Sequence, residues 1–214
     1  MTGFLDRLAR YARLILLIDS ALLFAGLGLT AFNLLLLGWS IYAVAHLGAI
    51  VAFISIAAYY RRSMDGWAWV GLGVLVVGLV LALPQIATIW QSYSQTPTGA
   101  VMIMPVETMP IGQIAELVTW IGLAWYGLVA RGPKALPRGT GWIFVTASIV
   151  GLLAFWSPIP LITHLWWVAA MLVLIFGLVA VGASLAPIEE HQEEHEADPT
   201  PDQAAARAPS KVTA

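Results

Sequence analysis

Few side chains in this 214-residue chain could do chemistry, and most of them lie inside long apolar stretches. Ionisable and amide groups in such surroundings need a hydrogen-bonding partner or a function, because burying them unpaired is costly. Six residues fit this description and are our candidate ligand-binding residues: Asn33, His46, Gln85, Gln113, Glu116 and His164. Asp19 is a further ionisable group in an apolar stretch. We expect it to pair with Arg13, Arg61 or Arg62, or with a tryptophan N–H.

Three of these candidates, His46, Glu116 and His164, have side chains that bind metals. Two imidazoles and a carboxylate suit Zn, Fe or Mn, and a haem held by His46 and His164 is a further alternative. The competing interpretation is that each side chain hydrogen-bonds a neighbouring helix or reaches the surface, which is ordinary in helical bundles. We therefore expect no cofactor, and we keep a redox or metal-binding protein as the alternative function.

Known catalytic motifs give no support for an enzyme. The chain lacks cysteine, which excludes disulfides and thiolate chemistry. It has no phosphate-binding loop, dinucleotide-binding glycine pattern, nucleophile elbow or kinase signature. His191, Glu194 and His195 match the H-x-x-E-H metalloprotease pattern, but they stand in a charged tail without a shaped, dry pocket. We assign no catalytic residue and expect a non-enzymatic protein.

The elements that carry the candidate residues are apolar helices. Hydrophobic residues make up 60% of the chain and charged ones 10%, which excludes a soluble globular domain. Ten Lys+Arg against twelve Asp+Glu exclude a nucleic-acid binder. Apolar runs of about 18 residues or more predict membrane-spanning helices, and we expect six: 14–37, 39–60, 67–90, 111–130, 141–156 and 161–185. Because the first two runs nearly touch, we expect Gly38 to be the hinge of a tight turn.

Six crossings place every lysine and arginine on one side of the membrane. Arg7, Arg10 and Arg13 precede the first run, two arginines follow the second, three basic residues follow the fourth, and two lie in the tail. By the positive-inside rule this side is the cytoplasm, so both termini are cytoplasmic. We expect an all-α bundle of six transmembrane helices in the plasma membrane.

With this topology, the six candidate ligand-binding residues all fall in the outer half of the membrane. Pro84 should kink the third helix near the same level, because proline has no N–H to donate to the carbonyl of Val80. The midplane is apolar on every helix, which argues against a channel or a proton-coupled transporter. We predict an outward-facing polar pocket for a lipid or small amphiphile, covered by the loop 91–110.

Both ends of the chain differ from the six-helix domain, residues 14–185. Residues 1–13 form a juxtamembrane segment with apolar residues at helical spacing, namely Phe4, Leu5, Leu8 and Tyr11. This pattern predicts a short helix on the inner membrane surface. Residues 186–214 are acidic and poor in apolar side chains, which predicts a disordered cytoplasmic tail.

Small residues four apart share helix faces: Ala45/Ala49, Gly48/Ala52, Gly78/Ala82 and Ala147/Gly151. Such pairs let helices approach closely, and we expect them to pack the bundle. Association with a second copy or another membrane protein is the alternative, so a half-transporter acting as a dimer is a third functional hypothesis. No repeat relates the first three helices to the last three, which does not favour an inverted-repeat transporter.

Three short motifs suggest a family. The basic loop 131–138 leads through Leu-Pro-Arg into Gly141-Trp142, which opens the fifth helix. Ala45-His46-Leu47 lies in the second helix, which leaves the membrane through Tyr-Tyr-Arg-Arg at 59–62. On these motifs, the chain resembles a broad group of uncharacterised bacterial six-helix integral membrane proteins. The resemblance implies the same topology in a bacterial inner membrane, and it implies no activity.

Overall fold

The computed structural model describes residues 2–32, 34–95, 110–130, 136–137, 139–157 and 159–185. Within these residues all regular structure is helical, which confirms the all-α fold class. The six described helices are α1 (Thr2–Ala31), α2 (Leu35–Tyr60), α3 (Gly66–Gln95), α4 (Pro110–Val129), α5 (Thr140–Trp156) and α6 (Pro160–Ser184).

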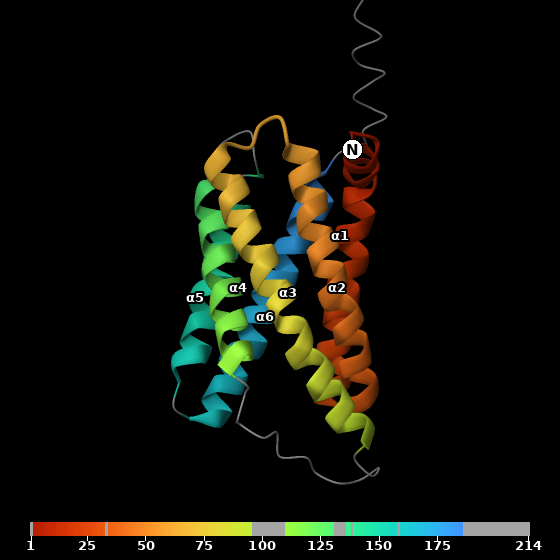
Figure 1. Cartoon of the computed structure of the whole chain (residues 1–214), viewed down its shortest axis with the longest axis vertical. Coiled ribbons are helices and arrows are strands. Elements are labelled where there is room, and N and C mark those ends of the chain that lie inside the picture. Colours follow the sequence, from red (N-terminus) through yellow and green to blue (C-terminus); the bar gives the residue numbers. More distant parts are fainter. Residues whose placement is uncertain are drawn as a thin grey trace, which may run out of the picture.

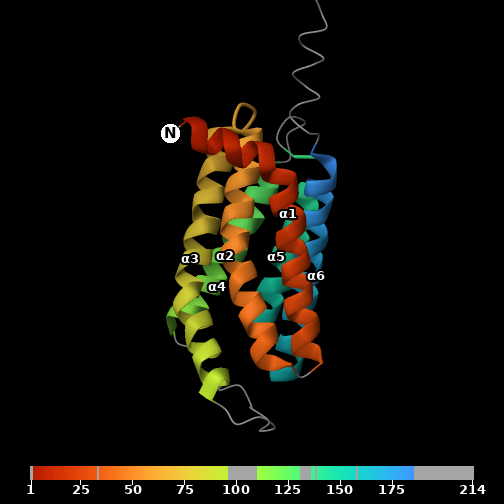
Figure 2. The same cartoon turned by 90° about the vertical axis from the view of Figure 1, so that its right-hand side faces the viewer.

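The helices form a closed ring in chain order. Successive helices run in opposite directions and pack side by side, and α6 closes the ring against α1 (Figures 1 and 2). The start of α1, the loop between α2 and α3, and the end of α6 meet at one end of the bundle. We name it the basic end, because all the described arginines lie there: Arg7, Arg10, Arg13, Arg61 and Arg62. The opposite end carries the connection between α1 and α2.

Four of the described helices are long and apolar enough to cross a membrane, at residues 3–31, 35–60, 66–92 and 162–184. These four helices support the prediction that the chain is a membrane protein. The other two are shorter, with 20 residues in α4 and 17 in the apolar α5. At 1.5 Å per residue, α5 is about 26 Å long.

Local chemistry explains where α3 begins and how it is shaped. Asp65 caps the helix, because its Oδ1 accepts a hydrogen bond from the Ala68 backbone N–H at 2.8 Å. Pro84 lies inside α3, and the turns beyond it lean away from α4 towards α2 (Figure 1). There the Trp90 Nε1–H donates to Ser40 Oγ at 2.9 Å. The bend at proline therefore lets one helix contact α4 along one half and α2 at its end.

The prediction that Gly38 is a hinge is wrong. α1 ends at Ala31 and α2 begins at Leu35, so the connection falls at residues 32–34 and Gly38 lies in the first turn of α2. An added Cβ at Gly38 would lie 2.8 Å from the backbone nitrogen of Thr30. The glycine lets α1 and α2 approach closely, and an unbroken apolar run gives no sign of where the chain turns.

The predicted N-terminal helix exists, but it is continuous with α1 rather than a separate element. Figure 2 shows its first turns lying across the basic end before the helix enters the bundle. An ion pair of 2.7 Å between Asp6 Oδ1 and Arg61 links these turns to the end of α2. Phe4 and Tyr11 are exposed, which suits a segment lying on a membrane surface.

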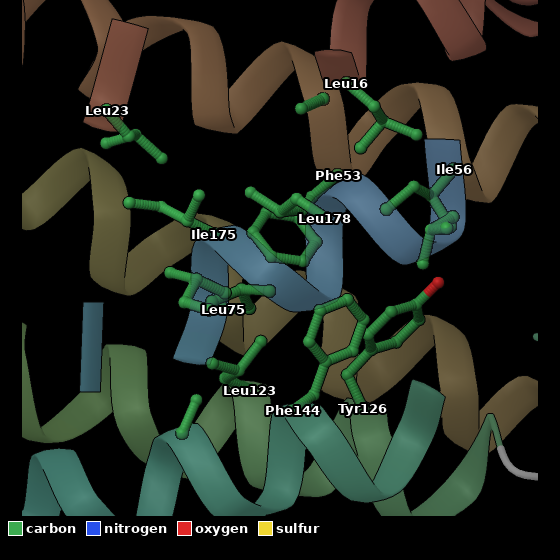
Figure 3. Packing of buried hydrophobic residues seen from close by; sticks show 14 of the residues in the cluster. Leu16, Leu23, Phe53, Ile56, Leu75, Leu123, Tyr126, Phe144, Ile175 and Leu178 are labelled. Atoms are coloured by element: carbon green, nitrogen blue, oxygen red, sulfur yellow. The ribbon is translucent and has the colours of Figure 1, made fainter. Parts of the chain in front are cut away.

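Aromatic rings and small residues fill the centre of the ring of helices. Phe53, Tyr126 and Phe144, from α2, α4 and α5, meet with ring centroids 5.9 to 6.3 Å apart (Figure 3). The predicted small-residue faces do pack the bundle, since these four alanines are buried: Ala45, Ala49, Ala52 and Ala147. At Gly78 an added Cβ would lie 2.5 Å from the backbone nitrogen of Thr119, so α3 and α4 touch through their backbones.

Candidate functional site

Tyr42 of α2 is the centre of a group of polar and aromatic side chains in the half of the bundle away from the basic end. Its ring centroid lies 6.2 Å from that of His46 and 5.8 Å from that of Trp167 on α6. Trp167 in turn stacks on His164, with centroids 6.3 Å apart and planes inclined by 20°. The two candidate histidines are therefore joined through the rings of Tyr42 and Trp167.

Glu116 of α4 reaches the same group. Its carboxylate lies within electrostatic range of Tyr42, and it accepts a long hydrogen bond from Trp120 Nε1 at 3.4 Å. α2, α4 and α6 thus all contribute to one group, which we name the Tyr42 cluster. Its members are Tyr42, His46, Glu116, Trp120, His164 and Trp167.

Helical spacing explains why these side chains meet. Tyr42 and His46 are four apart, as are Glu116 and Trp120, while His164 and Trp167 are three apart. Residues at these separations share a helix face. Sequence reasoning chose the ionisable members and missed all three aromatic partners. The signal was present, because His46, Glu116 and His164 each have an aromatic residue three or four positions away.

His46 is a structural member of the cluster. It is 7% exposed, and its Nε2 lies 2.9 Å from the Leu79 carbonyl oxygen of α3. Because a carbonyl oxygen only accepts, Nε2 carries the hydrogen, and in the neutral ring Nδ1 is left as an acceptor. This hydrogen bond links α2 to α3 next to Val80. The Val80 carbonyl oxygen has no helical N–H donor, because residue 84 is proline. It matches the interpretation that the imidazole hydrogen-bonds a neighbouring helix.

The candidate metal ligands are not gathered into one metal-ligating group in the described part of the chain. His46 lies beside Tyr42 and His164 beside Trp167, but no three His, Asp or Glu side chains within the described residues are grouped closely enough to hold a metal ion. Gln85 packs against Gly112 at the start of α4, and Gln113 is exposed. Asn33 lies outside the described residues.

Two pockets on the described surface lie away from the Tyr42 cluster. One, of about 250 Å³, is at the basic end and includes Arg10 and Arg13 in its lining. The other lies between α5 and α6, beside Trp142 and Phe176. Neither is lined by a residue of the cluster, whose exposed member is His164. The loop expected to cover an outward pocket falls mostly at residues 96–109, outside the described part of the chain, as does the acidic tail.

The predicted pairing of Asp19 with an arginine or a tryptophan is wrong. Asp19 is 2% exposed, and neither carboxylate oxygen has a hydrogen-bond partner among the described residues. The side chain points from α1 into α2, where it touches the position of Gly48. Arg61, one of the expected partners, binds Asp6 instead. Asp19 faces the α1–α2 contact rather than the basic end. The backbone N–H groups at this contact belong to helices, so they already donate to helical carbonyl oxygens.

Fold and site together define an all-helical protein whose long apolar helices suit a membrane. No family model, no curated protein and no solved structure matches the chain. The resemblance to bacterial six-helix membrane proteins therefore stays a prediction. A function has to be inferred from the geometry of the chain itself.

Proposed function

We propose that this chain crosses a bacterial inner membrane six times, and that it is a non-enzymatic accessory protein that binds a small amphiphile at the Tyr42 cluster. Both termini are cytoplasmic in this proposal, and the cluster lies in the outer half of the membrane. The ligand has a polar head with a hydrogen-bond donor and an apolar body.

The path of the chain supports six crossings. α3 runs away from the basic end and α6 runs back towards it, and both belong to the four helices able to cross a membrane. The chain between them therefore makes either no crossing or two. α4 packs antiparallel along α3 and α5 packs antiparallel along α6, so the axes of both shorter helices are aligned with those of their long neighbours. This arrangement supports two crossings, and a local thinning of the bilayer would accommodate the 17 residues of α5.

Charge supports the orientation. The described arginines all lie at the basic end, and the remaining lysines and arginines of the sequence lie in the loop after α4 and in the tail, which leave from that same end. By the positive-inside rule the basic end is cytoplasmic. The Tyr42 cluster then belongs to the outer half.

The observation that supports ligand binding at the Tyr42 cluster is the incomplete hydrogen bonding of Glu116. Its hydrogen bond to Trp120 is 3.4 Å long, at the edge of a useful interaction, and Tyr42 lies within electrostatic range of the carboxylate. A carboxylate beside aromatic faces accepts a hydroxyl or ammonium donor and stacks an apolar body. His164, exposed in the first turn of α6, marks the side from which such a ligand enters.

Fluorescence titration in phosphatidylcholine nanodiscs tests this function, with dodecylamine and dodecanol as probes. Two tryptophans belong to the cluster, so we expect saturable quenching in the natural protein. Glu116→Gln should weaken binding about tenfold, because hydrogen bonds to a charged group are worth about 1.5–3 kcal/mol. Asp19→Asn makes the same chemical change outside the cluster and is the matched control. Equal affinity in all three proteins would refute the proposed site.

The two alternative functions stay predictions. A coloured or metal-containing preparation of the purified protein would favour a redox or metal-binding protein using His46, Glu116 and His164. A defined dimer in detergent would favour the half-transporter. The described geometry gives neither alternative a specific supporting contact.

A further inference from the structure

The pocket at the basic end lies where three helices meet. It is lined by residues of α1 between Ala9 and Leu17, by Tyr59 in the last turn of α2, and by Leu185, the residue after α6. Its volume is about 250 Å³, which holds a phosphate and glycerol group rather than a whole lipid. It lies apart from the Tyr42 cluster, and its place at the cytoplasmic face rests on the orientation proposed above.

The lining of this pocket has two chemical parts. Arg10 and Arg13, three apart on α1, give it a doubly cationic rim, and Tyr11 adds a hydroxyl donor. Leu14 and Leu17 continue the wall one turn further into the bundle. Leu14 is 56% exposed, so this apolar wall opens onto the surface that faces the acyl chains of a bilayer.

The charge of the rim is not neutralised within the described residues. The ion pair found there joins Arg61 to Asp6, and neither Arg10 nor Arg13 has an acidic partner in that part of the chain. Two arginine side chains close together repel each other, and a phosphodiester between them removes the repulsion while accepting several charge-assisted hydrogen bonds.

We propose that this pocket is a binding site for an anionic phospholipid of the cytoplasmic leaflet. Arg10, Arg13 and Tyr11 hold the phosphate, and the first acyl carbons lie against Leu14 and Leu17. Basic pockets between membrane helices on the cytoplasmic side are typical sites for anionic lipid headgroups. A bound lipid would fix the bend of α1 against α2 and α6, whose residues complete the pocket.

The shape of the lining favours a lipid over the two other sources of negative charge. A free phosphate would leave the leucine wall unused. The acidic tail that follows Leu185 offers carboxylates, but residues 188–203 contain few apolar side chains to cover that wall. Only an amphiphile matches a cationic rim joined to an apolar wall.

Native mass spectrometry of the full chain, exchanged into micelles with phosphatidylglycerol or phosphatidylcholine, tests the proposal. We expect retention of phosphatidylglycerol, weakened about fivefold by Arg10→Gln or Arg13→Gln and about 25-fold by both, at about 1 kcal/mol per basic residue near the membrane. Arg62→Gln, an exposed arginine at the same end outside the pocket, is the matched control and should change retention less than about twofold. Phosphatidylcholine should not be retained.

Two further arms separate the sources of charge. Inorganic phosphate should not displace phosphatidylglycerol, and a chain ending at Pro187 should retain the lipid as well as the full chain does. Displacement by free phosphate would show a simple anion site and overturn the proposal. Lipid retention that Arg10 and Arg13 do not affect would also overturn it. The proposal would also be overturned if Arg10→Gln and Arg13→Gln changed the thermal stability of the full chain but not that of the chain ending at Pro187. The tail would then be the occupant of the pocket.

Discussion

At the scale of single residues, Asp19 is the least expected feature of the chain. A carboxyl buried to this extent costs free energy unless it is hydrogen-bonded, and no partner lies among the described residues. The α1–α2 contact is therefore held together by its other residues. Gly48 leaves room for the carboxyl, which suggests that the two positions depend on each other.

Replacing Asp19 with alanine should leave the free energy of unfolding unchanged within about 1 kcal/mol or raise it, because no hydrogen bond is lost. Denaturation in detergent, followed by circular dichroism, measures the change. Leu23→Ala is the comparison, since Leu23 is equally buried on the same helix. Loss of its packing should cost about 2 kcal/mol or more. If Asp19→Ala lowers the free energy of unfolding as much as Leu23→Ala does, the Asp19 carboxyl makes a stabilising interaction, and its description as unpaired is wrong.

The sequence was informative about residue type and uninformative about partners. His46, Glu116 and His164 were chosen because ionisable groups in apolar helices need a hydrogen-bonding partner or a function. All three belong to the Tyr42 cluster. Tyr42 was missed because a tyrosine in an apolar run looks like an ordinary core residue. Gln85 packs against Gly112 at the start of α4 instead. Depth follows from position along a helix, whereas contact depends on how helices are rotated, which the sequence does not state.

At the scale of elements, the closeness of α3 and α4 depends on glycine. An added Cβ at Gly78 would meet the backbone nitrogen and Cα of Thr119 at 2.5 and 2.7 Å. Backbone atoms cannot rotate out of the way as a side chain does. Gly73 is on the same helix, yet nothing lies within 4 Å of its added Cβ.

Gly78→Ala should therefore lower the free energy of unfolding by about 1–3 kcal/mol, because the two helices must move apart. Gly73→Ala should be neutral or stabilise by up to about 1 kcal/mol, since alanine favours the helix. Thermal unfolding of the two variants in the same detergent compares them directly. Similar stability of the two variants would mean that α3 and α4 do not touch at Gly78.

Helix number and approximate extent could be predicted because apolar runs record which segments avoid water. All six predicted segments overlap the six described helices. Boundaries were less accurate where polarity does not mark them. The α1–α2 connection lies among leucines, so Gly38 was taken for the hinge, and α3 continues five residues past Trp90. The N-terminal segment was recognised by its amphipathic pattern, but its continuity with α1 depends on contacts such as Asp6–Arg61.

At the scale of the whole molecule, the two ends of the bundle differ in charge and in what they can bind. The basic end has arginines and the pocket proposed for an anionic lipid, while the opposite half has the Tyr42 cluster. An apolar core with the aromatic rings of Phe53, Tyr126 and Phe144 separates them. The two proposed sites therefore lie in opposite halves of the bundle, and each is tested separately.

Membrane orientation is the property on which both proposed sites depend, and the absence of cysteine makes it directly measurable. Ser63 lies in the loop at the basic end and Ser157 lies between α5 and α6 at the opposite end, and both are partly buried. Ser157→Cys should react with a membrane-impermeant maleimide in intact cells, whereas Ser63→Cys should react only after the membrane is permeabilised. The reverse pattern would place the basic end outside and exchange the two leaflets, so the pocket of Arg10 and Arg13 would face the wrong lipids. Labelling of both from one side would rule out six crossings, because α3, α4 and α5 separate the two positions.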